Sequence, residues 1–164
     1  MPYRLVYLIV YRSRMYPAHW AMWIPRNDAD TQAIGMVGKY INVQGDSREG
    51  FVHEITRSHD MAQSNRNKEV ILLGWTDEVN VVDNSGETET YFDTEAIDRL
   101  EEIALQIPAP GPSLRSASSS SSGSRTRVAL QNCQTWMTEV VGNLVENNLL
   151  EEGANTVIAN APKN

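Results

Sequence analysis

The chain has 164 residues, of which 41% are hydrophobic, and a formal net charge of −7 at pH 7. This length suffices for one compact domain with a buried core, so residues 1–164 are interpreted as a single domain. The acidic balance argues against a nucleic-acid partner, because a phosphate-binding surface needs clustered lysine and arginine. The arginines near the N-terminus, Arg4, Arg12 and Arg14, are interpreted as a solvated rim.

The N-terminal apolar run, residues 5–11, is short and holds two tyrosines. It therefore predicts a first strand rather than a signal peptide. No stretch approaches the roughly 20 apolar residues of a membrane span, so none is expected. Cys133 is the single cysteine, which suits a reducing compartment, and we expect a cytoplasmic protein.

The first half of the chain has the pattern of a β-sheet. Runs rich in Val, Ile, Tyr and Trp alternate with turn-forming segments such as Gln44-Gly45-Asp46. The polar stretch from Ser58 to Lys68 predicts a loop or a short helix, with an exposed His59. The runs predict a largely antiparallel meander, with strands over residues 3–11, 18–24, 36–43, 50–56 and 69–75.

A helix over about residues 95–107 follows. Asp93 or Thr94 is placed to cap its start, and an apolar stripe along one side predicts a buried face. Glu101 and Glu102 are adjacent, so their side chains point in different directions. We interpret them as part of a solvated face rather than as an acid–base pair.

Residues 111–126 are dominated by serine and predict a flexible loop. The next helix begins near Cys133 and carries an apolar stripe, from Cys133 to Leu144, which is expected to pack against the sheet. A last helix or strand ends near Ile158. The whole pattern predicts an α+β fold in which an antiparallel β-sheet packs against helices.

Cys133 lies where a reactive thiolate is expected, directly after the N-cap-type residue Asn132. The start of a helix exposes unpaired N–H groups and carries a partial positive charge, which favours S⁻ and binds an anionic oxygen. Gln131 and Gln134 are candidate oxyanion donors beside the thiol. A small buried apolar residue is the alternative interpretation of Cys133.

His19 is the candidate base. It lies in the strand-like run over residues 17–24, where alternation places it on one face with Ala21 and Trp23. A nucleophile and a base that are far apart in the sequence and meet in the fold are typical of cysteine enzymes. Trp20 is a candidate substrate contact. A core histidine bonded to a backbone carbonyl is the alternative.

Two patches carry a resemblance to a known family: residues 18–24, Ala-His-Trp-Ala-Met-Trp-Ile, on a strand, and residues 132–134, Asn-Cys-Gln, at a helix start. They resemble the papain-like superfamily of the NlpC and lecithin–retinol acyltransferase type, in which a strand histidine precedes a helix cysteine. The resemblance implies a papain-like core, with Cys133 as nucleophile and His19 as base. The layout is also similar to small uncharacterised fungal proteins, which implies no activity.

The resemblance also implies a third polar residue that orients the imidazole. Lecithin–retinol acyltransferase-like enzymes have a second histidine on the next strand, and this chain has Asn42 there. An asparagine carbonyl oxygen can accept the imidazole N–H, as in papain-like Cys-His-Asn sets. His53, on the following strand, is the competing third residue.

The sequence therefore predicts a cysteine-dependent acyl-transfer enzyme, a hydrolase or an acyltransferase, which forms an acyl-thioester on Cys133 with His19 as base. Its substrate is expected to be a small molecule or an acyl or peptidyl compound. No cofactor and no metal are expected, because the chain lacks a phosphate-binding glycine loop and a recognised metal-ligand spacing. The alternative is a non-catalytic small-molecule-binding or dimerising domain, for instance a homodimer, that keeps the fold.

Overall fold

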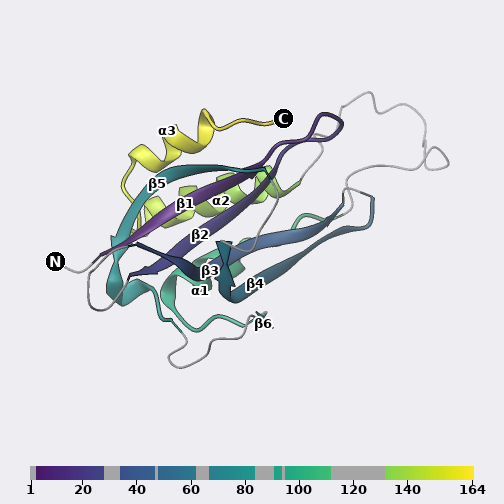
Figure 1. Ribbon diagram of the computed structural model, residues 1–164. Helices are drawn as coiled ribbons and strands as arrows, with labels where there is room; N and C mark the ends of the chain where they lie inside the picture. The colour runs from purple at the N-terminus through teal and green to yellow at the C-terminus, as the bar shows by residue number, and fades with distance from the viewer. Residues whose placement is uncertain are drawn as a thin grey trace.

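The strands form one antiparallel sheet. The computed structural model describes residues 3–27, 34–46, 48–61, 67–83, 91–93, 95–111 and 132–164. Within these residues the sheet has six strands in the order β5-β1-β2-β3-β4-β6 (Figure 1). The strands are β1 (Tyr3–Tyr11), β2 (His19–Asn27), β3 (Ile34–Asp46), β4 (Gly50–Asp60), β5 (Glu69–Asp77) and β6 (Tyr91–Asp93), with a short 3-10 turn, η2 (Glu78–Asn80), after β5.

The predicted meander holds for β1 to β4 and is wrong for β5. Each of the first four strands pairs with the next, whereas β5 pairs with β1, from Tyr3↔Asp77 to Val10↔Glu69. This arrangement places β1 inside the sheet, where it pairs with β2 along one edge and with β5 along the other. β6 pairs with the outer edge of β4.

Strand β4 is longer than the sequence predicted. The stretch from Ser58 onward was expected to leave the sheet, but β4 stays paired with β3 as far as Val37↔Asp60. The pairing of β3 with β4 continues through a β-bulge. Its register shifts between Gly38 and Tyr40 on β3, and Ser58 on β4 has a positive φ of 53°.

Three helices cover one face of the sheet: α1 (Arg99–Gln106), α2 (Cys133–Glu146) and α3 (Gly153–Ala159) (Figure 1). Helix α2 buries its whole predicted stripe, from Cys133 to Leu144. Helix α1 begins later than predicted, because Asp98, rather than Asp93 or Thr94, caps it by accepting the N–H of Glu101 at 2.7 Å. Among the described residues, no helix has the length and apolarity to cross a membrane. The predicted loop at 111–126 lies outside the described residues, apart from Gly111.

Alternation along the strands gives the sheet two different faces. One, the helix face, joins side chains such as Trp20, Met22 and Ile41 to the helices in a single core. The opposite face has a separate cluster, here called the aromatic face, made of Tyr7, Ile9, Tyr11, Ala21, Trp23, Tyr40 and Met61. Both clusters remove apolar surface from water, which stabilises the fold by roughly 25 cal/mol per Å².

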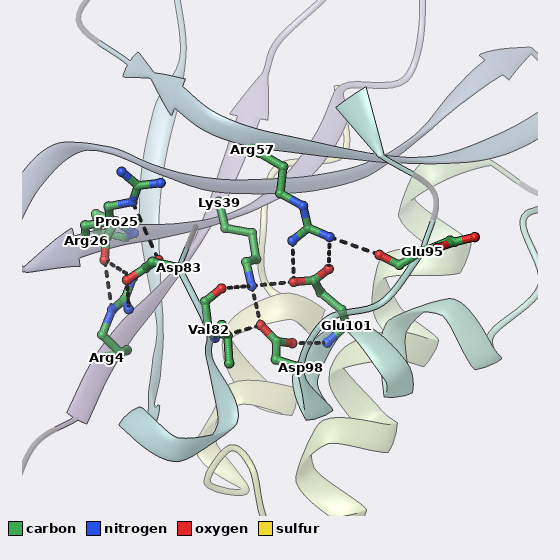
Figure 2. A network of polar contacts seen from close by, with 10 residues as sticks. All are labelled: Arg4, Pro25, Arg26, Lys39, Arg57, Val82, Asp83, Glu95, Asp98 and Glu101. Atoms are coloured by element: carbon green, nitrogen blue, oxygen red, sulfur yellow. Dashed lines mark hydrogen bonds and ion pairs between the residues drawn. The ribbon is translucent and has the colours of Figure 1, made fainter. Parts of the chain in front are cut away.

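A buried ion cluster joins α1 to the helix face (Figure 2). Lys39 on β3 contacts the carboxylates of both Asp98 and Glu101, and Arg57 on β4 holds Glu101 through two contacts of 2.6 Å. The Lys39 ammonium also donates to the carbonyl oxygen of Val82. Glu101 has no exposed surface. The sequence-based interpretation of Glu101 as solvated is therefore wrong, because two buried cations from the sheet compensate its charge.

Arg4 is likewise buried rather than part of a solvated rim. Its guanidinium donates to the carbonyl oxygen of Pro25 at 2.8 and 3.1 Å and to Asp83 at 2.6 Å. These contacts connect β1, the end of β2 and the segment after η2 (Figure 2). Arg12 does follow the prediction, since its exposed side chain pairs with Glu69.

Glu101→Ala is expected to lower the free energy of unfolding by about 3–5 kcal/mol, because it leaves Lys39 and Arg57 buried with too little negative charge. Glu102→Ala is the matched control. Glu102 is exposed, so its loss should change stability by no more than about 0.5 kcal/mol. Urea unfolding of both variants measures the difference, and equal values would show that the ion cluster contributes nothing specific.

Candidate functional site

Cys133 is the first residue of α2. Asn132 caps the helix, since its side-chain oxygen accepts the N–H groups of Gln134 at 2.9 Å and Thr135 at 3.3 Å. Thr135 Oγ1 accepts the N–H of Asn132 in return, which completes a capping box. The sequence signal Asn132-Cys133 thus placed the helix start correctly.

The thiol of Cys133 lies against an open edge of β2. The backbone N–H of Trp20 points to Sγ at 3.4 Å, and Sγ lies 3.8 Å from the carbonyl oxygen of Ala18. The paired residues of β2 and β3 begin only at Met22↔Ile41, so the β2 edge from Ala18 to Trp20 is left to α2. The two contacts are to the residues directly before and after His19. The structure therefore brings Cys133 to the backbone of His19.

The imidazole of His19 lies on the aromatic face, away from the core under α2. It stacks on Tyr11, with ring centroids 5.8 Å apart and ring planes 26° apart. Tyr11 and His19 form the last cross-strand pair of β1 and β2. Cys133 thus meets β2 at the edge facing β3, while Tyr11 flanks His19 from the β1 side.

Burial raises the pKa of the Cys133 thiol. The N–H groups of Trp20, Gln134 and Cys133 itself act in the opposite direction and offset only part of that rise. Placement at the helix start predicted a resting thiolate. The structure instead favours the neutral thiol, because burial disfavours the charged thiolate.

Asn42 is the predicted third residue that shares a face with His19. Because Trp23 pairs with Tyr40 and Met22 with Ile41, Asn42 lies level with Ala21, one residue pair further along the aromatic face. Its side chain is fully buried, and neither amide atom has a hydrogen-bond partner among the described residues. Asn42 therefore lies near the proposed base without bonding to it.

His53, the competing third residue, lies on the other side of the sheet. Its Nε2 is 2.7 Å from the carbonyl oxygen of Ile107, and its ring lies 5.8 Å from that of Trp136 on α2. It is thus on the helix face, whereas the His19 ring is on the aromatic face. Of the two candidates, the geometry favours Asn42.

The predicted substrate and oxyanion residues have structural roles here. Gln134 donates its two amide hydrogens to the carbonyl oxygens of Ala18 and Lys163, both at 2.9 Å, which leaves none for an oxyanion. Trp20 is 1% exposed, and its indole N–H donates to Pro162, so it is a core residue rather than a substrate contact. Gln131 lies outside the described residues.

Sequence reasoning missed His59. It was expected to be exposed, but its ring lies 4.6 Å from that of Tyr40 and meets Trp23 edge-on at 5.8 Å. The bulge at Ser58 shifts the alternation by one residue and turns His59 onto the aromatic face. Burial lowers the pKa of His59, an effect that Asp60 opposes.

His59→Phe tests that shift. The unfolded chain takes up a proton on His59 near its usual pKa of 6.5, and the folded chain does so only at lower pH. The stability due to neutral His59 is therefore complete above pH 6.5 and is lost as the pH falls. We expect the urea midpoint to drop more between about pH 7.5 and about pH 5.5 in the wild type than in His59→Phe. Equal drops would assign the pH dependence to other groups.

Asn42→Leu tests whether the buried amide of Asn42 lacks hydrogen-bond partners in solution, as it does among the described residues. A buried amide without partners costs about 1–3 kcal/mol, so its replacement by an apolar side chain of similar size should raise the free energy of unfolding by about 1 kcal/mol. Asn42→Asp, which buries a charge, should lower it. Urea unfolding gives both values, and a loss of stability in Asn42→Leu would mean that the amide is hydrogen-bonded in solution.

A metal centre finds no support in the part of the chain that the structure describes. There, no three side chains of His, Cys, Asp or Glu are grouped closely enough to hold a metal ion. His19 and His59 are on the aromatic face, whereas His53 is on the helix face.

A family model described as a family of unknown function, DUF6540, matches residues 6–151. The chain belongs to the DUF6540 family. The matched segment of this DUF6540 protein contains His19, Asn42 and Cys133, and therefore the whole site described above. No curated protein and no solved structure matches the chain.

Proposed function

We propose that this DUF6540 protein is a papain-like thiol enzyme, a hydrolase or an acyltransferase, which forms an acyl-thioester on Cys133 with His19 as base. The observation that carries the proposal is the position of Sγ. It contacts the peptide groups of Ala18 and Trp20, on the two sides of His19, at the first residue of a capped helix. A buried cysteine that served only as a small apolar side chain would need no such placement.

The arrangement of the elements also supports a core like that of the NlpC and lecithin–retinol acyltransferase type. Helix α2 begins with the cysteine and packs against an antiparallel sheet. His19 is the first residue of β2, the strand that the cysteine touches. Asn42 follows on the neighbouring strand, on the same face as His19.

The neutral thiol determines how the reaction would begin. His19 takes the Sγ proton as Sγ attacks the carbonyl carbon of the substrate, and a C–S bond forms while the carbonyl oxygen becomes an oxyanion. The imidazolium then gives its proton to the leaving alcohol or amine as that group departs. Water, an amine or an alcohol attacks the resulting thioester, and the proton returns to Sγ.

Acetylation by p-nitrophenyl acetate tests the proposal. We expect one acetyl group on Cys133, located by peptide mass spectrometry, and none on Cys133→Ser. His19→Ala should acetylate about 100-fold more slowly, because the general base is lost. His53→Gln is the matched control, since its amide can still donate to Ile107 and its position on the helix face is remote from the His19 ring; it should react like the wild type.

Equal acetylation of the wild type and His19→Ala would refute the enzyme. Cys133 would then be an ordinary buried thiol with its own slow reactivity. His53→Gln as slow as His19→Ala would instead place His53 in the site, against the geometry.

The second candidate is a non-catalytic binding or dimerising domain. A groove of about 680 Å³, large enough for a small molecule, supports it. The groove lies between β5 and the segment that joins α2 to α3, at the opposite end of α2 from Cys133, and its walls include Trp75, Leu149 and Leu150. Two results would favour this candidate if acetylation fails. One is that a fluorescent apolar probe binds the wild type and not Trp75→Ala, and the other is a dimer in sedimentation equilibrium.

A further inference from the structure

We infer that Tyr11, held by Tyr40, is the positioning residue of His19. The inference rests on the proposed function and deepens it, because it assigns the orienting role that Asn42 does not fill in this structure. Neither amide atom of Asn42 has a hydrogen-bond partner among the described residues, so Asn42 does not fix the imidazole. The contacts of Tyr11 do reach it.

Tyr11 stacks on the ring of His19. Tyr11 is 5% exposed and is the cross-strand partner of His19. The two rings are 26° from parallel, with centroids 5.8 Å apart, which is the range of favourable aromatic stacking. An imidazole in such a contact has fewer accessible rotamers than one that projects freely from a strand.

Cys133 and Tyr11 approach His19 from opposite sides. Cys133 meets β2 at the edge facing β3, through Trp20 and Ala18. Tyr11 comes from β1, on the other side of His19. Tyr11 therefore occupies the space on the β1 side of His19, the side opposite to the thiol.

Tyr40 in turn holds Tyr11 in place. Its hydroxyl donates to the hydroxyl of Tyr11 at 3.2 Å, and both rings are buried. Tyr40 pairs with Trp23 and Tyr11 with His19, so this bond crosses β2 over Ala21. Alanine is small enough to leave that path open. The strand sequence His19-Trp20-Ala21 thus provides the base and the space for its support.

Other titratable groups on the aromatic face could influence the same ring. In the described residues these are Tyr7, Glu54 and His59, while Cys133 approaches from α2. Burial raises the pKa of Glu54 and lowers that of His59, so both changes favour the neutral forms of these two groups. Tyr11 itself acts on the His19 ring through the aromatic stack and through steric contact.

Four variants separate positioning from general stability. Tyr11→Leu removes the stack, Tyr11→Phe keeps the ring and removes the hydroxyl, and Tyr40→Phe removes the same hydrogen bond from its other end. Tyr7→Phe is the control, because Tyr7 is on the same strand and face but pairs with Trp23 rather than His19. Each is assayed for kcat and KM with p-nitrophenyl acetate and by the NMR signals of the His19 ring.

For Tyr11→Leu we expect kcat to fall about 100-fold with KM unchanged, since a misplaced base slows the step without weakening binding. Tyr11→Phe should retain most of the activity, and Tyr11→Phe and Tyr40→Phe should give equal effects that do not add in the double variant. The His19 ring signals, a single sharp set in the wild type, should shift and broaden in Tyr11→Leu. Tyr7→Phe should match the wild type in every measurement.

The result that overturns the inference is a His19 spectrum as sharp in Tyr11→Leu as in the wild type, or a kcat lost equally in Tyr7→Phe. The NMR signals also separate this inference from the proposed function. If no variant is acetylated but the His19 signals broaden in Tyr11→Leu, the enzyme is refuted and the support of His19 by Tyr11 stands. If acetylation depends on His19 and not on Tyr11, the enzyme stands and the positioning role is refuted.

Discussion

The rest of the structure depends on how the edge of β2 between Ala18 and Trp20 is satisfied. Backbone groups that are buried without partners destabilise a fold, and β3 does not pair with this part of β2. The C-terminal third of the chain supplies the partners. Cys133 contacts the peptide groups around His19, Gln134 donates to Ala18, and the N–H of Ala18 donates to the carbonyl oxygen of Lys163. The same contacts that complete the sheet therefore anchor α2 and place its cysteine.

This arrangement couples reactivity to burial. A thiol that helps to complete a sheet edge must be sheltered from water, and shelter raises its pKa. Such a cysteine needs a base at the moment of attack, whereas a solvated thiolate at a helix start would not. In the proposed mechanism the orientation of the imidazole therefore matters more than its charge, and Tyr11, which stacks on His19, bears directly on that orientation.

Several parts of the fold could be predicted from local pattern alone. Alternation and β-branched residues located the strands, and the Asn132-Cys133 pair located the start of α2. Such signals are local, so they do not say that β5 returns to β1. They also could not show that Glu101 is buried, because its compensation comes from Lys39 and Arg57, about 60 and 40 residues earlier in the chain. The pairing of Tyr11 with His19 is equally invisible until the strands are aligned.

The bulge at Ser58 has a consequence for the evolution and engineering of β4. In a strand, the face on which a side chain appears depends on whether its position is odd or even, and one extra residue reverses that parity. Deleting Ser58 would leave every other side chain chemically intact. It would also leave His59 on the aromatic face, because Thr56 pairs with Tyr40 and His59 with Gly38, so β4 has one residue more than β3 between these pairs and the deletion only makes the ladder regular. A deletion in the regular part of β4, between Gly50 and Thr56, would instead exchange the two faces for every residue on one side of it. Loss of one residue would therefore be far less disruptive at the bulge than elsewhere in β4.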